Sequence, residues 1–469
     1  MEFLAKDSKG DAFPRLCLSD SIRHDDPCVQ QLLRTIEEAP TLAQLILAVG
    51  PLARVLARQV VEYVLAERAQ RPSMWPLCPT GGVPLRRKGF AQRQRMSLVG
   101  PLRWRRRVGR CPHGCPIPQV APFDEALGGQ PHQRTSGALQ LLGCAFAVFV
   151  PFAPAARLLG WSCGGMVSPR AVWGWVQAAG HRAMALLQED LEAVARGDAL
   201  PQEALAAALA ALPLALGADG VMVPLRPTGG APTGKIRWRE ITVGVLARLG
   251  QHRTRLGQVV TRLQHRRLVA VLGDIEALSP RLWGEAVRQG ILQAPRVVWL
   301  SDGGRGLWRL FEERFASHAR GIVDFYHAAQ QLWKSAAAWL DGRTPQARRW
   351  FSWARHRLRH GMPDGVLADL ADALDVEGLP ETARETVRTV YASLQRHREH
   401  INYDMDKERG LPLGSGMVES ACTWLIPQRF KGVGMRWSEE GFNHLVHLRL
   451  AWVNGRFEVL FGLALSPNP

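Results

Sequence analysis

Two apolar segments decide the fold of this chain: LALGADGVMVPLR at Leu214–Arg226 and RVVWLS at Arg296–Ser301. Both are short, rich in Val and Leu, and bounded by Gly, Pro or Asp, which is the pattern of buried β-strands. REITVGVLAR at Arg239–Arg248 predicts a strand after the first, and Gln258–Arg267 predicts another. Three strands in hairpin order, followed by alternating helix and strand, predict an α/β layout with a mixed sheet.

Helices are predicted around and inside this sheet domain. Ile275–Gln289 and Leu307–Phe315 flank the RVVWLS strand, and Gly321–Phe325 predicts a fifth short strand. Residues 328–412 are nearly all helical, so they interrupt the domain, and a last helical stretch runs from about Met417 to Phe457.

The sequence upstream of the sheet domain has a different pattern. Apolar spacing predicts helices over 27–70, and Ala153–Leu159 followed by Arg170–Ala179 has helix-turn-helix proportions, which plain packing also produces. The predicted division is a helical region 1–70, a basic strand-rich module 71–135, a helical region with a helical linker 136–212, the sheet domain's first part 213–327, the insertion 328–412, and a C-terminal helical part with tail 413–469.

The charge of the chain is concentrated in one stretch. Of 469 residues, 59 are Lys or Arg and 42 are Asp or Glu, a net charge of +17, and Arg68–Phe123 contains twelve basic residues and no acidic one. This excess predicts a polyanionic partner, most simply nucleic acid, although charge runs are often only solvated faces. Interleaved apolar residues favour folded strands that bind phosphates. The expected DNA contacts here are Arg86, Arg87, Lys88, Arg103, Arg105, Arg106 and Arg107.

Composition also bears on compartment. A hydrophobic fraction of 46% excludes a wholly disordered chain. The longest apolar run, Leu141–Ala156, is interrupted by prolines and is shorter than the roughly 20 residues of a membrane helix. The N-terminus shows no signal-peptide pattern, and eight Cys show no disulfide framework. We therefore expect a cytoplasmic, nucleoid-associated protein without a membrane segment.

Three acidic residues carry the candidate chemistry. Asp219 interrupts an apolar strand, Asp302 follows the RVVWLS strand, and Glu419 begins a helix. Each alone has an ordinary explanation, because Asp-Gly is a common turn and Glu suits a helix N-terminus. Together they suit two-metal phosphoryl transfer, in which carboxylates hold Mg²⁺ or Mn²⁺ ions about 4 Å apart.

The ordered motifs ADG, SDGGRGLW, VDFYH, GSGMVES and RFKGVGMRWS resemble the DDE transposases of bacterial insertion sequences, specifically the Kra-type family related to Mutator-like transposases. The resemblance spans about Cys78 to Phe457. It implies an RNase H-like core with Asp219, Asp302 and Glu419 as a catalytic triad that holds two metal ions. Asp324-Phe325-Tyr326-His327 resembles an element that follows the second Asp, where His327 either positions a phosphate, a base or a metal-bound water, or is a core histidine.

Further residues fit contacts with DNA or zinc. Gly229–Ile236 lacks the Ser or Thr of a phosphate-binding loop, so it predicts a hairpin loop in which Lys235 touches DNA. The resemblance also implies DNA contacts at Arg429, Lys431, Arg436 and Trp437, against the alternative of a solvated loop with a core Trp. The family's zinc ribbon is degenerate here, leaving either a zinc site or reduced cysteines. The candidate zinc ligands are Cys78, Cys111, His113 and Cys115.

The sequence therefore predicts a metal-dependent transposase that acts on double-stranded DNA. Its expected partners are terminal inverted repeats, target DNA and further copies of itself in a synaptic complex. Two alternatives remain: a non-catalytic DNA-binding remnant, and an RNase H-like nuclease that cuts without joining.

Overall fold

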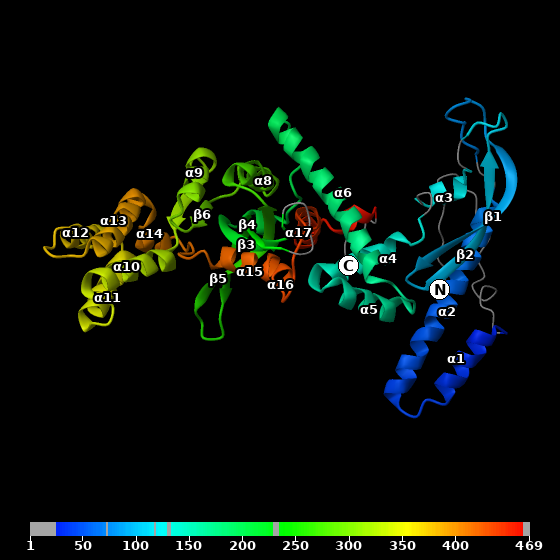
Figure 1. Cartoon of the computed structure of the whole chain (residues 1–469), viewed down its shortest axis with the longest axis horizontal. Coiled ribbons are helices and arrows are strands. Elements are labelled where there is room, and N and C mark those ends of the chain that lie inside the picture. Colours follow the sequence, from blue (N-terminus) through cyan, green and yellow to red (C-terminus); the bar gives the residue numbers. More distant parts are fainter. Residues whose placement is uncertain (1–24, 72–73, 117–118, 129–132, 228–233, 463–469) are drawn as a thin grey trace. The chain divides into compact units, whose positions relative to one another are not determined.

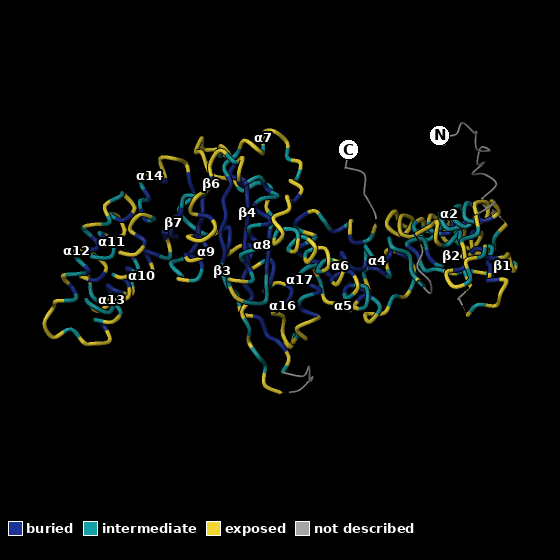
Figure 2. Tube along the Cα trace, turned by 90° about the horizontal axis from the view of Figure 1, so that it is seen from above, coloured by how far each residue is buried: buried dark blue, intermediate teal, exposed yellow. Residues whose placement is uncertain are grey.

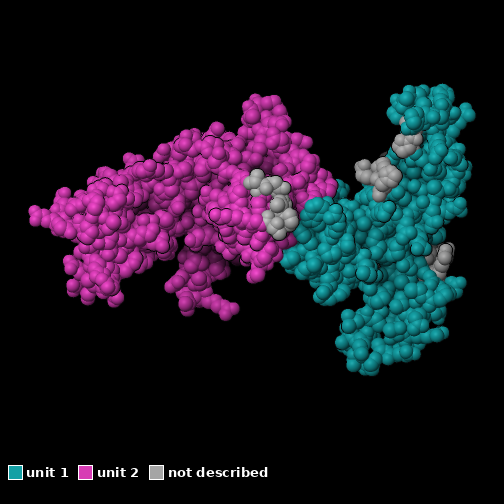
Figure 3. All heavy atoms as spheres, viewed as in Figure 1, with its two compact units in different colours: residues 1–175, 461–469 teal, residues 176–460 magenta. Residues whose placement is uncertain are grey.

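The chain folds into two compact units, which Figure 3 colours separately. One unit comprises residues 1–175 with 461–469, and the other comprises residues 176–460. The division falls inside one long helix, α6 (Pro169–Arg196), and is coarser than the six regions expected from the sequence. The structure is a computed structural model that describes residues 25–71, 74–116, 119–128, 133–227 and 234–462 (Figure 1).

The first unit contains a pair of helices and a two-stranded antiparallel ribbon. The predicted helices over 27–70 and the predicted strand-rich stretch after them are confirmed. The ribbon turns at Ser97, whose Oγ donates to the Gly100 carbonyl oxygen at 2.7 Å and accepts from the Val99 N–H at 3.2 Å. The elements before α6 are α1 (Pro27–Glu37), α2 (Leu42–Gln70), β1 (Arg86–Ser97), β2 (Gly100–Arg110), α3 (Pro122–Ala126), α4 (Gly137–Phe149) and α5 (Phe152–Cys163).

Helix α2 is long and apolar enough, by length and composition, to cross a membrane. Few residues of its apolar window are buried, and Leu42 and Leu47 are exposed. The helix nevertheless lies along β2, and the Glu62 carboxylate accepts from the Arg103 N–H at 2.7 Å. Core helices of soluble proteins pass the same test, although they are mostly buried. The contacts with β2 make α2 a part of the ribbon module.

Helices α5 and α6 have the predicted helix–turn–helix order but not its proportions. Ser168 caps α6, its Oγ accepting from the Ala171 N–H at 3.2 Å. Helix α6 runs for 28 residues, far beyond the predicted second helix. The predicted helical linker to residue 212 is helical only in part: α6 continues to Arg196, Gly197 takes a φ of +80°, and helix resumes only briefly in α7 (Ala207–Ala210).

The second unit is built on a mixed five-stranded sheet, as predicted. Its strand order is β5-β4-β3-β6-β7, with antiparallel pairing from β5 to β3 and parallel pairing from β3 to β7. Figure 2 shows that β3 and β4 are buried over much of their length. The strands are β3 (Leu214–Leu225), β4 (Arg237–Arg253), β5 (Val259–Val271), β6 (Val297–Ser301) and β7 (Arg320–Val323).

Helices connect and interrupt this sheet. Helix α8 (Ile275–Arg288) joins β5 to β6, and α9 (Arg305–Arg314) joins β6 to β7. The insertion is helical as expected and begins at Phe325, directly after β7. Its helices are α10 (Phe325–Leu340), α11 (Pro345–Arg359), α12 (Pro363–Leu374), α13 (Glu381–Arg396) and α14 (Tyr403–Glu408), and the chain returns through α15 (Gly416–Leu425), α16 (Pro427–Phe430) and α17 (Glu439–Val453).

Helix α15 lies directly against β3 because Gly217 has no side chain. A Cβ at this position would lie 2.3 Å from the Leu300 carbonyl oxygen and 2.8 Å from Val418 Cγ2. The absent side chain therefore lets the helix that carries Glu419 approach the strand that carries Asp219.

Replacing Gly217 with Ala should separate α15 from the sheet. We expect Gly217→Ala to lower the free energy of unfolding by on the order of 2 kcal/mol, the usual cost of overpacking. Gly416→Ala is the matched control, because a Cβ at this first residue of α15 meets no atom within 4 Å. Urea denaturation followed by tryptophan fluorescence measures both, and equal loss of stability in the two variants would contradict this account of Gly217.

Candidate active site

The parallel pairing of β3 and β6 brings Asp219 beside Asp302. The register aligns Gly217 with Leu300, and two residues further along each chain stand Asp219 and Asp302. Neighbouring strands lie about 4.8 Å apart, so the two acidic residues share one level of the sheet. Both are half-buried, Asp219 within β3 and Asp302 just after β6.

The loop that carries Asp302 is held by hydrogen bonds on both sides. The indole N–H of Trp308 donates to the Asp302 carbonyl oxygen at 2.7 Å, and the Ser301 hydroxyl donates to the same oxygen at 3.2 Å. The Asp302 carboxylate accepts from the Gly304 N–H at 2.9 Å, at the start of α9. These bonds fix the backbone and one carboxylate oxygen, leaving the other oxygen for a ligand.

Asp324 connects this strand end to the helix that carries Glu419. Its backbone N–H donates to the Ser301 carbonyl oxygen at 2.9 Å. Its buried carboxylate accepts from the N–H groups of Tyr326 and His327, at the start of α10, and from the N–H and hydroxyl of Ser415. One carboxylate thus caps α10 and fixes the residue that precedes α15.

Glycine and arginine complete the placement of α15. A Cβ on Gly414 would lie 2.8 Å from the ring of Tyr326, so only glycine permits this approach. At the other end of α15 the buried guanidinium of Arg449 donates to the carbonyl oxygens of Trp424 and Leu425 at 2.6 and 3.1 Å. A cation at a helix C-terminus stabilises the helix dipole. Glu419 therefore projects from a helix that is held at both ends.

The carboxylates of Asp219, Asp302 and Glu419 act on one another electrostatically. Partial burial raises the pKa of Asp219, and the negative charges of Asp302, Glu419 and Glu240 raise it further, against the Gly220 N–H that donates to its carboxylate at 2.7 Å. Burial likewise raises the pKa of the Cys422 thiol to about 12, with Asp219 and Glu419 adding to the effect.

The carboxylate cluster has the donor atoms that a divalent cation prefers, but not the spacing of a site for one ion. Within the described part of the chain, none of the three carboxylates forms an ion pair with Lys or Arg, so nothing basic neutralises them. Carboxylate oxygens are the preferred ligands of Mg²⁺ and Mn²⁺. Their oxygens do not all lie within 4.8 Å of one another, whereas three cysteine sulfurs do. A ligand set shared between two ions is wider than one built around a single ion.

Sequence reasoning missed two neighbours of this cluster. Glu240 of β4 lies over Gly220, and its carboxylate charge reaches Asp219. The β3–β4 hairpin register pairs Gly220 with Thr242 and Met222 with Glu240, so it places Glu240 diagonally opposite Gly220 and could have indicated this neighbour. His397, just after α13, is only 3% exposed, and burial lowers its pKa to about 4, while the Asp302 charge acts in the opposite direction. No linear pattern connects a residue of the insertion to Asp302.

His327 lies in the wall of a small cavity beside the acidic cluster. Its Nε2 is 3.0 Å from Gln331 Nε2, and the cavity is also lined by Gly303 and His397. About 10 Å³ is open to the centre of a water molecule, which is room for roughly one water. His327 is half-buried, and its role as a site residue stays a prediction.

The ribbon presents a basic face around one aromatic ring. The guanidinium carbons of Arg87, Arg105 and Arg107 lie 5.1, 5.7 and 6.0 Å from the centre of the Phe90 ring. Arg86, Arg87, Lys88, Arg103 and Arg105 are exposed. Arg107 is half-buried, and its guanidinium donates to the Gln70 carbonyl oxygen at 2.8 Å. Arg106 is a correction to the predicted set, because its Nε is 2.9 Å from Asp124 Oδ2 and its Nη1 donates to the Ala91 and Gln92 carbonyl oxygens. Its side chain holds the module together.

Two predicted DNA contacts near Glu419 are core residues instead. Arg429 is only 2% exposed, and its guanidinium lies 5.3 Å from the centre of the Trp437 ring. Burial lowers the pKa of Arg429 to about 10. The indole N–H of Trp437 donates to the Phe430 carbonyl oxygen at 3.1 Å, and its ring packs on Phe430. Neither side chain is therefore available to DNA in this structure.

The other basic residues of that prediction are exposed. Lys431 and Arg436 lie in the connection between α16 and α17, and Lys235 lies just before β4. Residues 229–233 of the predicted hairpin loop fall outside the described residues.

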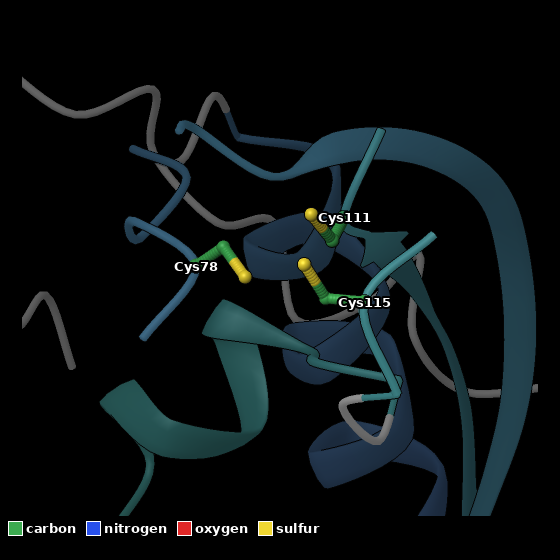
Figure 4. A group of neighbouring side chains, drawn as sticks. All are labelled: Cys78, Cys111 and Cys115. Carbon is green, nitrogen blue, oxygen red and sulfur yellow. The ribbon is translucent and has the colours of Figure 1, made fainter. Parts of the chain in front are cut away.

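Three of the four predicted zinc ligands come together in the ribbon module (Figure 4). The sulfurs of Cys78, Cys111 and Cys115 all lie within 4.8 Å of one another. Burial opposes ionisation of Cys111, but the N–H groups of His113 and Cys115 and two neighbouring thiols lower its pKa overall. The ring of the predicted ligand His113 is not part of this cluster among the described residues. The backbone N–H of His113 instead hydrogen-bonds to the Cys111 sulfur.

Comparisons with known proteins give only distant structural likenesses. No protein-family model matches this chain, and no curated protein matches it. Among solved structures, a chain of the Drosophila P element transposase strand transfer complex is similar, with 10% sequence identity and a TM-score of 0.33. The match covers 70% of this chain and 94% of that chain. A likeness of this size does not decide fold or function, which rest here on the geometry.

Asp219→Asn should stabilise the fold, because it removes one charge and keeps an acceptor for the Gly220 N–H. The pKa of Asp219 in the folded chain lies above its ordinary value of 3.8, so the folded state binds the proton more tightly than the unfolded state. The wild type therefore loses stability as the pH rises above 3.8, and this cost is complete above the folded pKa.

We expect Asp219→Asn to raise Tm at pH 7 in the presence of a chelator, and the difference to vanish below pH 3.8. Mn²⁺ should raise the Tm of the wild type more than that of the variant. Thermal unfolding at several pH values measures both effects, and a variant less stable than the wild type at pH 7 would count against charge repulsion in this cluster.

Proposed function

We propose that this chain is a DDE transposase of a bacterial insertion sequence, of the Kra-type family that its motifs resemble. The main support is that three carboxylates without a basic partner among the described residues act on one another. They come from Asp219 in β3, from Asp302 just after the neighbouring strand β6, and from Glu419 in α15, which follows the long helical insertion. In this proposal Asp219, Asp302 and Glu419 hold two Mg²⁺ or Mn²⁺ ions, and the sheet domain is an RNase H-like core.

The proposed reaction is phosphoryl transfer on DNA. When bound, the two ions supply a Lewis acid and stabilise the attacking and leaving oxygens. A water oxygen attacks the phosphorus and the bond to the 3′-oxygen breaks, which frees a 3′-hydroxyl. That hydroxyl oxygen then attacks a phosphorus of the target DNA and gives up its proton. The bond from this phosphorus to the target strand's 3′-oxygen breaks, so the element end is joined and a target 3′-hydroxyl is released. His327 and Gln331 border the cavity next to Asp302, where they would orient a water or a phosphate oxygen.

The basic surfaces hold DNA in this proposal. The ribbon face around Phe90 neutralises phosphates of the terminal inverted repeats, and the exposed Lys235, Lys431 and Arg436 bind phosphates in the second unit. Bringing two element ends together requires more than one protomer, so the proposed working form is a homo-oligomer on DNA in the cytoplasm.

Neutralising either of two carboxylates should slow the chemistry. We expect Asp302→Asn and Glu419→Gln to slow Mg²⁺-dependent cleavage by about 10²- to 10³-fold, because several kcal/mol of charge stabilisation disappears. The assay uses purified protein and a duplex carrying the inverted repeats that flank its gene, with circular dichroism to check folding. Glu312→Gln, at an exposed carboxylate of α9, is the matched control and should cleave normally.

The products of this assay separate the proposal from its alternatives. Joined target strands support a transposase, whereas cleavage without joining would indicate a nuclease. Full cleavage by both carboxylate variants would show that the active site is wrongly placed, and tight DNA binding with no cleavage by the wild type would indicate a DNA-binding remnant.

The ribbon's part in DNA binding has its own test. We expect the triple change of Arg87, Arg103 and Arg105 to Ala to weaken DNA binding and to flatten its dependence on salt. The slope of log K against log salt should fall by about 0.9 for each lost phosphate contact. Fluorescence anisotropy over a range of KCl concentrations measures this slope, and the charge-preserving triple change to Lys is the control. An unchanged slope in the Ala variant would exclude this face.

A further inference from the structure

The three-cysteine cluster lies at the base of the basic ribbon. Cys78 precedes β1, and Cys111 follows β2 directly. Figure 4 shows the three sulfurs pointing toward one another from these two loops. Cys78 and Cys111 are 1% and 7% exposed and pack with Leu85. Three sulfurs that converge from the two loops at the open end of the hairpin, beside the Arg86–Arg110 pair, are arranged as ligands rather than as separate core side chains.

The loop at Cys78 has the backbone of a metal-binding turn. The Gly81 N–H donates to Cys78 Sγ at 3.2 Å, and the Gly82 N–H donates to the Cys78 carbonyl oxygen at 2.8 Å. Gly82 takes a φ of +61°, which glycine adopts without strain. The turn therefore holds Cys78 Sγ in place beside the other two sulfurs.

The second loop is built in the same way. The Gly114 N–H donates to the Cys111 carbonyl oxygen at 3.2 Å, and Gly114 takes a φ of +69°. This turn returns the chain so that Cys115 lies beside Cys111. Two turns that each place sulfur toward one centre are the usual frame of a tetrahedral zinc site.

The fourth side of the cluster is occupied by Gly81. A Cβ built on Gly81 would lie 3.2 Å from Cys115 Sγ, 3.6 Å from Cys78 Sγ and 3.7 Å from Cys111 Sγ. A side chain at this position would thus reach all three sulfurs. The described residues offer no fourth His, Cys, Asp or Glu within the cluster. The backbone turn is complete, but the ligand that it would carry is absent.

We propose that Cys78, Cys111 and Cys115 bind one Zn²⁺ as three thiolates, and that the fourth tetrahedral position, beside Gly81, is open to an exogenous ligand. Binding replaces the three S–H protons, which pass to solvent, and no oxidation or reduction is involved. The open position takes water and exchanges it for a small thiolate or imidazole, the donors that zinc accepts. The ion joins the loop before β1 to the loop after β2, at the open end of the hairpin that carries the basic face.

Cobalt is the probe for this site, because its visible absorption reports coordination number and donor type. The full-length reduced chain should bind one equivalent of Co²⁺ with sulfur-to-metal charge transfer, and zinc should displace it. Added imidazole should shift the visible bands of the wild type. Gly81→Cys should bind Zn²⁺ more tightly, show the bands of a four-thiolate site, and give no response to imidazole.

Matched variants keep the test decisive. Gly81→Ala adds a methyl group without a donor, so its cobalt bands should still respond to imidazole. Cys78→Ser should lose binding, while Cys28→Ser, at an exposed cysteine of α1, should bind normally. A mercurial reagent releases zinc from the wild-type protein as purified. The amount of zinc released per chain measures metal binding without depending on how the variants fold. The proposal fails if the wild type binds no metal, or if its cobalt spectrum ignores imidazole as that of Gly81→Cys does.

Discussion

The carboxylate of Asp324 is the interaction on which the arrangement of the second unit depends. This carboxylate accepts hydrogen bonds from the N–H groups of the first turn of α10 and from the N–H and hydroxyl of Ser415. The backbone N–H of Asp324 donates to the Ser301 carbonyl oxygen at the end of β6. Residues 324 and 415 are separated by the whole helical insertion. A buried carboxylate requires several donors, and here the donors come from the segments that must meet. The cost of burying this group is what makes the connection specific.

The acidic cluster beside this connection lowers the stability of the fold. Asp219, Asp302 and Glu419 have no basic partner among the described residues, and burial and mutual repulsion raise the pKa of Asp219. Rigid neighbours offset this cost. Gly217 admits α15 against β3, and Arg449 caps the far end of the same helix. The protein thus keeps like charges close together by fixing the elements that carry them.

The two units differ in the sign of the charged side chains that they present. The ribbon places arginines around Phe90 on one face, whereas the sheet unit exposes carboxylates at its centre. The arginines that stabilise each unit are of another kind. Arg106 pairs with Asp124, and Arg429 is almost completely buried next to Trp437. Counting basic residues therefore overestimates the surface that is available to a polyanion.

The sequence by itself determined the element order, the mixed sheet and the positions of the three acids, because hydrophobic periodicity and strand-end residues are local properties of the chain. It also marked the cysteine loops. Only the tertiary structure decided which side chains are free: it placed Arg106, Arg429 and Trp437 in structural contacts, left His113 out of the sulfur cluster and turned Asp324 into a connector. Exposure and hydrogen-bond partners depend on segments that pack from far along the chain, and no local pattern contains that information.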